Sequence, residues 1–350
     1  MQEVLSEIEV WKARGDRIAL ATVIDVQRSA PRPPGAKMAV NEHGEIAGSV
    51  SGGCVEGAVV EVADAVLRGE QPRMLHFGIA DSEGWEVGLP CGGEIEVWVQ
   101  CYEPGRFIEV ARSGDRAAEV TLLEGARPGA KLLIEADGAR SGSLGAPELD
   151  DEAVLTASEV LWTDASERRG PLFIDVIAPA PRLIMFGAVD IATSLCRLAH
   201  AAGWRPYVVD PRARFTASER FPDAEEVIAA WPEEAFARLG GVDPATFIVV
   251  LTHDPKLDDA ALALALRSPA AFVGAMGSRR ANATRRERLL ASGLGEAELA
   301  RLSAPLGLDL GAITREETAL SILAEIVAAR HGREGGRLAH RNGRIHEVPA

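Results

Sequence analysis

The chain has few cysteines and fewer basic than acidic residues, and each shortage excludes a class of function. Four cysteines in 350 residues are too few and too irregularly spaced for a disulfide scaffold, and no C-x2-C or H-x3-H spacing around them indicates zinc. Lys and Arg number 37 against 52 Asp and Glu, which gives a formal net charge of −15. This charge argues against nucleic acid and anionic membranes as partners.

The sequence also lacks a long hydrophobic run and a targeting signal. No stretch approaches the roughly 18 uninterrupted apolar residues of a membrane span. The first residues, MQEVLSEIEVWKARG, show neither the charged-then-apolar design nor the cleavage motif of a secretory signal. We therefore expect a cytoplasmic protein with free thiols.

What is present indicates more than one domain. A chain of 350 residues with 47% hydrophobic content exceeds the size at which single cores stop growing, roughly 250 to 300 residues. Residues 1–104 are expected to form an N-terminal α/β domain. Strands are predicted at 17–27, 37–41 and 94–104, and residues 46–68 read as a short strand, a Ser/Gly turn and a helix.

The remaining chain changes texture twice. Residues 105–181 are expected to form a β-rich connector, with strands in EVTLLEG, KLLIEADG and PLFIDVIAP. Strands then alternate with helices, as at 182–187 and 191–202, which predicts a Rossmann-like, doubly wound parallel sheet over 182–332. Residues 333–350 read as a polar tail, and no internal repeat is visible in the sequence.

The expected Rossmann turn departs from the dinucleotide pattern G-x-G-x-x-G, which lets backbone N–H groups approach a pyrophosphate. In GAVDIA, Gly187 can make the tight turn, but Val189 places a branched side chain where the phosphates should come closest. Asp190 either competes with a phosphate for the helix N-terminus or caps the helix. Asp210 occupies the usual ribose-hydroxyl position. The turn therefore leaves nucleotide binding open.

Two polar clusters follow later strands, at the sheet edge where doubly wound folds place ligands. In the sequence THD, His253 could transfer a proton or orient a ligand, or it could belong to a loop hydrogen-bonding cluster. In GAMGSRR, Gly277 ends a strand, Ser278 is an N-cap candidate and Arg279 opens a helix. This combination suits an anion. The alternative is an ordinary strand-to-helix turn with solvent-facing arginines.

Two cysteines stand in glycine-rich turns. In GSVSGGCVEG, Gly52 and Gly53 are free to adopt positive φ, and Cys54 follows at the start of a helix. Helix N–H groups stabilise a thiolate, so the pKa of Cys54 is expected to be lowered, and a soft anionic sulfur suits a molybdenum or sulfur-transfer site. LPCGG repeats the arrangement with Cys91 and Gly92, and the two thiols could share one pocket. The alternative for each cysteine is a small buried hydrophobe.

The other candidates lie nearby in the sequence. Arg28 and Arg32 belong to the Pro-rich turn RSAPRPPG, which either grips a phosphate or forms a stiff surface turn. Cys101 and Cys196 fall in strand and helix patterns and are expected in the core.

Together these motifs resemble the xanthine dehydrogenase accessory factor family, XdhC/CoxI. The matching stretches span nearly the whole chain except the connector and the tail: SAPRPPGAKM, GSVSGGCVEGAVVE, GWEVGLPCGGEIEV, LIMFG, LTHDPKLDD, FVGAMGSRR and GLDLGAITREETALSILAEIVAAR. The family's cysteine in the GGC turn corresponds to Cys54, and that of the CGG turn to Cys91. The family's Rossmann turn looks like F-G-A-G-H-V-A, from which this sequence departs at Val189 and Asp190.

The resemblance implies an accessory protein that transiently binds a molybdopterin-type molybdenum cofactor, protects it, supports its sulfuration and delivers it to a molybdenum hydroxylase such as xanthine dehydrogenase or carbon monoxide dehydrogenase. The expected partners are the apo-subunit of that hydroxylase, a cysteine desulfurase and a second copy of the chain. No catalytic residue or metal ligand is expected. The expected cofactor-binding residues are Ser51, Gly52, Gly53, Cys54, Glu56, Cys91, Gly92, Arg28, Arg32, Gly187, Asp210, His253, Gly277, Ser278 and Arg279.

Two functions from other classes stay open. The chain could be an NAD(P)-dependent oxidoreductase that uses the Rossmann-like domain, with His253 as acid or base. It could instead be a non-enzymatic scaffold that joins hydroxylase subunits to a sulfurase through its acidic surface. Nicotinamide binding tests the first alternative, and partner binding in the absence of cofactor tests the second.

Overall fold

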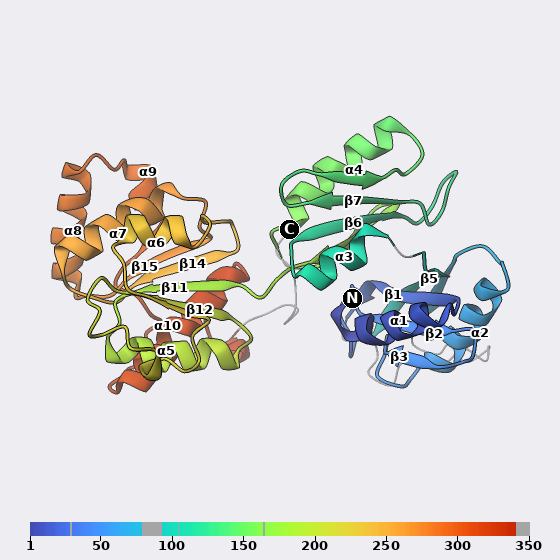
Figure 1. Ribbon diagram of the computed structural model, residues 1–350, viewed down its shortest axis with the longest axis horizontal. Coiled ribbons are helices and arrows are strands. Elements are labelled where there is room, and N and C mark those ends of the chain that lie inside the picture. Colours follow the sequence, from blue (N-terminus) through green and yellow to red (C-terminus); the bar gives the residue numbers. More distant parts are fainter. Residues whose placement is uncertain (29, 79–92, 104, 164, 341–350) are drawn as a thin grey trace. The chain divides into compact units, whose positions relative to one another are not determined.

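The chain forms two compact units, Met1–Pro179 and Ala180–Ala350, in a computed structural model (Figure 1). No helix among the described residues is long and apolar enough to cross a membrane. The expected boundary between residues 104 and 105 lies inside the first unit and stays a prediction. The structure describes residues 1–28, 30–78, 93–103, 105–163 and 165–340.

The first unit begins with a five-stranded antiparallel sheet in the order β3-β2-β1-β5-β4. Along β1, Ala19 and Ala21 pack with α2, whereas Ile18 and Leu20 pack with α1 on the other face. Because both faces are covered, the strand reads as a continuous apolar run. The elements are α1 (Gln2–Arg14), β1 (Ile18–Gln27), β2 (Lys37–Asn41), β3 (Ile46–Gly48), α2 (Glu56–Leu67), β4 (Arg73–Phe77) and β5 (Glu94–Cys101).

A second antiparallel sheet follows, in the order β8-β7-β6-β10-β9. Ala153 and Ala157 of α4 pack on one face, and Phe107 and Val110 of α3 pack on the other. The expected strands are present, but the strand-dominated pattern of this region does not predict the two helices. The elements are α3 (Arg106–Ser113), β6 (Ala117–Leu122), β7 (Lys131–Glu135), β8 (Arg140–Gly142), α4 (Pro147–Val160), β9 (Glu167–Arg169) and β10 (Leu172–Ile177).

The two sheets of the first unit repeat one topology. Each follows a helix, uses the same strand order and carries a helix between its third and fourth strands. The turn between the first two strands reads RPPGAK at residues 32–37 and RPGAK at residues 127–131. In both halves the lysine that ends this turn pairs with a threonine, Lys37 with Thr22 and Lys131 with Thr121. The expectation of no internal repeat is therefore wrong. The repeat was not visible in the sequence because the likeness between the two halves in sequence is confined to short turns.

Equivalent residues of the two halves meet where the sheets pack together. Trp98 and Phe173 occupy the same register position, opposite Thr22 and Thr121, and both lie in one small buried cluster. Beside this cluster, the Nζ of Lys37, which is 1% exposed, lies 2.5 Å from a carboxylate oxygen of Asp175 on β10. A buried ion pair and a small hydrophobic cluster thus join the two halves.

The second unit holds a six-stranded parallel sheet in the order β13-β12-β11-β14-β15-β16, which confirms the expected doubly wound fold (Figure 1). One core lies under α5 and α10, and the other under α6, α7 and α8. The main elements are β11 (Arg182–Phe186), α5 (Asp190–Ala201), β12 (Arg205–Val209), β13 (Glu226–Ile228), α6 (Pro232–Arg238), β14 (Thr246–Val250), α7 (Pro255–Arg267), β15 (Phe272–Ala275), α8 (Arg279–Ala291), α9 (Glu296–Leu299), β16 (Leu302–Ser303) and α10 (Arg315–Arg330).

The substitution Asp175→Asn should lower the free energy of unfolding of the first unit by about 3 to 5 kcal/mol, because it leaves the buried Lys37 charge without its counterion. Urea denaturation followed by circular dichroism measures the change. Asp151→Asn is the control, since the Asp151 side chain is 79% exposed in its pair with Arg140 and should cost less than about 0.5 kcal/mol. Equal effects of the two substitutions would contradict the structural role of the buried pair.

Candidate functional site

The GSVSGGCVEG turn, hereafter the thiol turn, connects β3 to α2. Gly52 and Gly53 adopt φ values of 78° and 111°, in the left-handed region that favours glycine. The two glycines turn the chain before the helix, and Cys54 follows them outside the helix, which begins at Glu56. The Cys54 side chain is half-buried and packs at the edge of the valine-rich core under α2.

The carboxylate of Glu56 organises this turn. It accepts hydrogen bonds from the hydroxyls of Ser49 and Ser51, each at 2.5 Å, and from the backbone N–H groups of Ser51 and Gly53, each at 2.9 Å. Longer bonds from the N–H groups of Val50 (3.2 Å) and Val55 (3.1 Å) complete the set. Desolvation by burial raises the pKa of Glu56, but these hydrogen bonds outweigh it and lower the pKa to about 2.

The turn uses its own backbone donors. The N–H of Gly52 donates to the Ser49 hydroxyl and that of Cys54 to the Ser51 hydroxyl, while Glu56 accepts the others between residues 50 and 55. An incoming phosphate would therefore compete with Glu56 for these N–H groups. Glu56 positions the turn, and the group that the turn presents is the thiol.

The second half of the first unit contains a corresponding turn. Ser143 and Asp150 correspond to Ser49 and Glu56, because in each pair the hydroxyl donates to the carboxylate seven residues later. The N–H of Leu144 also donates to Asp150, at 2.7 Å. The carboxylate-held turn is thus part of the repeated architecture and not specific to the thiol.

The two turns differ in the residues before the carboxylate. Counting from the serines places Glu148 opposite Cys54 and Pro147 opposite Gly53. Helix α4 already begins at Pro147, three residues before its carboxylate (150 − 147), whereas α2 begins only at Glu56. The first half therefore replaces one helical turn with a glycine turn that carries a cysteine.

The Pro-rich turn lies beside the thiol turn. A Cβ built at Gly52 would lie 3.9 Å from Cβ of Pro31. In the sequence of the Pro-rich turn, Pro31 lies between the two predicted site residues Arg28 and Arg32. Arg28 lies 3.8 Å from a carboxylate oxygen of Glu94, and Arg32 forms an ion pair with Glu3 of α1. Both arginines thus face carboxylates of the chain itself.

Two predicted residues of the N-terminal site, Cys91 and Gly92, lie outside the described residues. Among the described cysteines, Cys196 is buried as expected. Cys101 is exposed, and its prediction as a core residue is wrong, because it stands at the end of β5 where the strand leaves the sheet.

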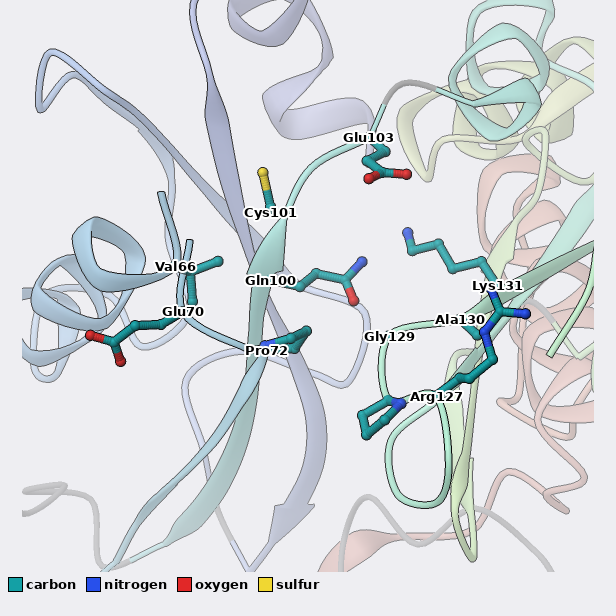
Figure 2. A pocket seen from close by; sticks show the side chains of 11 residues that line it. Val66, Glu70, Pro72, Gln100, Cys101, Glu103, Arg127, Gly129, Ala130 and Lys131 are labelled. Carbon is teal, nitrogen blue, oxygen red and sulfur yellow. The ribbon is translucent and has the colours of Figure 1, made fainter. Parts of the chain in front are cut away.

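Cys101 borders a cavity of about 360 Å³ between the two halves, which the sequence motifs do not indicate (Figure 2). Although the residue is exposed, partial desolvation raises the pKa of the Cys101 thiol, and the charge of Glu103 raises it further. Figure 2 shows Arg127 and Lys131 on the side opposite Cys101, with Gln100 between them. In register, Lys131 corresponds to Lys37 and Gln100 to Asp175. The cavity thus occupies the counterpart of the buried ion pair, with a neutral amide in place of the carboxylate.

In the second unit, the Rossmann turn is packed closely. Gly187 has a φ of 114°, and a Cβ there would lie 2.3 Å from Cγ2 of Thr252. The N–H of Ala188 donates to the Asp210 carboxylate at 2.9 Å, and Arg212 donates to both oxygens of the same group. Asp210 is 0% exposed, so a ribose hydroxyl would have to displace these donors to reach it.

Asp190 does not cap α5. The N-cap residue is Val189, and Asp190 occupies the first helical position, where its carboxylate lies 3.3 Å from Arg220 and 4.0 Å from Arg315. The N-cap prediction is wrong because the helix begins one residue earlier than that role requires. The prediction for Ser278 is confirmed, since its hydroxyl accepts the N–H of Ala281 at 3.1 Å.

After β14 and β15, the first residues of α7 and residues along α8 border a second, open cavity of about 370 Å³. It brings together His253 and Ser278, which the sequence predicted, but not Gly187 or Asp210. Arg280 lines this cavity in place of the predicted Arg279, because the side chain one position further along α8 faces inward. Gly277, with a φ of 132°, allows the turn into α8.

Fold and site together define an α/β protein with a duplicated antiparallel unit that carries a thiol turn, followed by a Rossmann-like unit. The XdhC Rossmann domain matches residues 183–326, and the family described as the XdhC and CoxI family matches residues 11–78 and 110–169. The chain belongs to the XdhC and CoxI family. The two stretches 11–78 and 110–169 each run from the helix that opens one half to its fourth strand, as the repeat requires.

The chain is 29% identical over 323 residues to a protein of Bacillus subtilis (strain 168) named as a probable xanthine dehydrogenase subunit, covering 90% of this chain and 94% of that protein. It is 26% identical over 317 residues to the molybdenum cofactor insertion chaperone PaoD of Escherichia coli (strain K12), covering 90% and 84%. A crystal structure described as a xanthine dehydrogenase from Bacillus halodurans has a TM-score of 0.63 and 26% identity, covering 94% of this chain and 96% of that one.

Glu56→Gln should lower the free energy of unfolding by about 1 to 2 kcal/mol at pH 7, a value discounted for solvent screening of this partly exposed carboxylate. Because the pKa is lowered from 4.5 to about 2, the stabilisation is complete above pH 4.5 and is lost as the pH falls toward 2. Urea denaturation at several pH values should show the variant and the wild type converging over this range.

The matched control is Glu61→Gln, an exposed glutamate on the same helix. It should change the stability by less than about 0.5 kcal/mol at any of these pH values. A Glu56→Gln difference that stayed constant from pH 7 to pH 3 would show that the charge of Glu56 does not hold the turn.

Proposed function

We propose that this chain is an accessory protein of a molybdenum hydroxylase, which holds the molybdenum cofactor and passes it to the enzyme. Support comes from its family and from its similarity, over most of both chains, to a protein named as a molybdenum cofactor insertion chaperone. The cofactor is of the molybdopterin type and is bound transiently. The proposed role is protection, support of sulfuration and delivery, without catalytic turnover by this chain.

The thiol turn is the observation that carries the proposal. One half of a duplicated unit keeps a regular helix start, and the other replaces it with two glycines and a cysteine. Among the residues that the structure describes, a Cβ built at Gly53 meets nothing within 4 Å, so none of them closes off the space next to Cys54. The second half connects its strand to its helix with a regular helix start, so the connection alone does not require the glycines and the cysteine of the first half.

The residues present suit a molybdenum pterin. When bound, that group supplies a metal with affinity for soft sulfur ligands, and the Cys54 thiol is such a ligand. Glu56 fixes the direction of the turn, while Ser51, Gly52 and Gly53 keep the approach to the sulfur free of larger side chains. Arg28 and Arg32 of the adjoining turn are the proposed contacts for the anionic part of the ligand, and Cys91 with Gly92 is the proposed second thiol turn.

We further propose that the hydroxylase apo-subunit and a cysteine desulfurase are the partners of this chain, which acts as a homodimer in the cytoplasm. In the second unit, the proposed contacts with the cofactor or its nucleotide are His253, Gly277 and Ser278, with Arg280 lining the cavity and the predicted Arg279 preceding it at the start of α8. Gly187 and Asp210 shape the adjoining turn. A free thiol requires a reducing compartment, which is consistent with the few and unevenly spaced cysteines.

Cys54→Ala should remove molybdenum and pterin from the protein purified after co-expression in a host that synthesises molybdopterin. The loss should be at least about tenfold by metal and pterin analysis, because the proposed soft ligand is gone. Cys101→Ala is the control, since it deletes an exposed thiol of the same unit and should keep the wild-type content. If Cys54→Ala carries cofactor and activates the hydroxylase as the wild type does, the thiol assignment is wrong. That result would favour the alternative of a non-enzymatic scaffold.

The oxidoreductase alternative makes an opposite prediction about nicotinamide nucleotides. The Asp210 carboxylate already accepts hydrogen bonds from Ala188 and Arg212, and Val189 lies where a phosphate would approach. Isothermal titration with NAD(H) or NADP(H) should therefore show no affinity tighter than about 1 mM. Submillimolar binding by the full chain would revive that alternative.

A further inference from the structure

The cavity after β14 and β15, hereafter the Arg280 cavity, lies one strand away from the usual dinucleotide position. The chain adds β12 and β13 on one side of β11 and then adds β14, β15 and β16 on the other side, so the topological switch point lies between β11 and β14. The Gly187 turn lies at that point. The Arg280 cavity is instead bordered by the first residues of α7 and by residues along α8. It therefore forms a separate site at the same edge of the sheet.

The charge of the Arg280 cavity is opposite to that of the chain. Its lining contains three arginines and one aspartate, a formal charge of +2 (3 − 1), in a protein of net charge −15. Arg285 pairs with Asp258 at 2.9 Å, and Arg288 pairs with Asp259 at 2.6 Å. Arg280 has no carboxylate partner among the described residues, so its charge is the uncompensated one.

Arg285 is fixed beneath the cavity and has a donor to spare. It is 3% exposed and donates to Asp258 and to the carbonyl oxygen of Met276, at 2.9 Å each. Its Nε–H is buried without a hydrogen-bond partner among the described residues. A buried guanidinium donor without an acceptor is costly, and a bound anion is one group that supplies the acceptor.

The start of α8 adds backbone donors. Ser278 caps the helix through the N–H of Ala281, and among the described residues the N–H groups of Arg279 and Arg280 have no acceptor. His253 also lines the cavity and is exposed. Helix N–H groups, arginine and histidine together form the set of donors that proteins use for phosphate.

We infer that the Arg280 cavity binds a phosphate group, as a phosphate monoester or the diphosphate of a nucleotide. Arg280 and the first N–H groups of α8 contact the phosphate oxygens, while Asp258 acts through Arg285 as a positioning residue. Thr252 donates its hydroxyl to Asp258 and also packs under Gly187, which links the cavity to the Rossmann turn. This inference deepens the proposed function, on which it rests for the presence of a cofactor nucleotide, because it names the phosphate group and the donors that hold it. Phosphate binding here does not depend on the thiol of Cys54, so the two proposals can fail separately.

Isothermal titration of the full chain with pyrophosphate tests the inference. The wild type should bind it saturably, and Arg280→Ala should weaken the affinity by at least about tenfold. Arg286→Ala is the matched control, because Arg286 lies on the same helix, pairs with Glu296 and does not line the cavity. It should change the affinity by less than about twofold, since the charge of an exposed side chain outside the cavity is largely screened.

Three further titrations distinguish a nucleotide from other phosphate ligands, and they test whether the phosphate site and the thiol site are independent. Inorganic phosphate and CDP are compared with pyrophosphate: tighter binding of CDP indicates a nucleotide, and equal binding of CDP and pyrophosphate indicates recognition of the phosphates alone. Cys54→Ala should bind pyrophosphate as the wild type does, even if it has lost molybdenum. The inference is overturned if the wild type shows no saturable binding, or if Arg280→Ala and Arg286→Ala lose the same affinity.

Discussion

The carboxylate of Glu56 determines the shape of the turn on which the proposed function depends. A carboxylate that is partly withdrawn from water must bind several donors, and this one binds two hydroxyls and four backbone N–H groups of its own turn. Because Glu56, Ser49 and Ser51 accept the N–H groups of residues 50–55, the two glycines can leave the helical path without leaving these N–H groups unpaired. The cysteine then stands before the helix and not inside its first turn.

The duplicated architecture shows which part of that turn is structural and which is a departure from the repeat. Asp150 performs for the second half what Glu56 performs for the first, through the equivalent serine and backbone N–H. The serine is shared, whereas the carboxylate is an aspartate in the second half and the residues between serine and carboxylate differ. The same comparison applies at the interface of the halves, where a buried Lys37–Asp175 pair on one side corresponds to a cavity with Lys131 and Gln100 on the other.

In the second unit, Asp258 has a comparable role. It accepts from Thr252, whose methyl group requires glycine at position 187, and from Arg285, which reaches the carbonyl oxygen of Met276 after β15. Three loops at one edge of the sheet are therefore coupled through one buried carboxylate. The Rossmann turn keeps its glycine for packing against Thr252, while the cationic donors gather one strand further along.

Much of this protein was determined by the local sequence. The period of apolar residues predicted β1, β2, α2, β5 and the alternating strands and helices of the second unit, because burial on one or both faces leaves a regular pattern in the chain. Ser278 was recognisable as a helix cap, and Cys54 as the cysteine of a glycine turn, since both depend on neighbours within a few residues. The family resemblance also rested on such local motifs.

Only the tertiary structure decided what depends on distant partners. The strand pattern of residues 105–181 did not reveal two helices or the repeat of the first half. The halves share mainly register and strand order, and residue identity only at a few short turns and single positions. Asp210 and Arg32 are suited by type to bind a ligand. In the folded chain, however, Asp210 accepts hydrogen bonds from Ala188 and Arg212, and Arg32 forms an ion pair with Glu3. The cavity at Arg280 and the exposure of Cys101 likewise follow from which elements pack together, since a side chain's surroundings are set by segments far from it in the sequence.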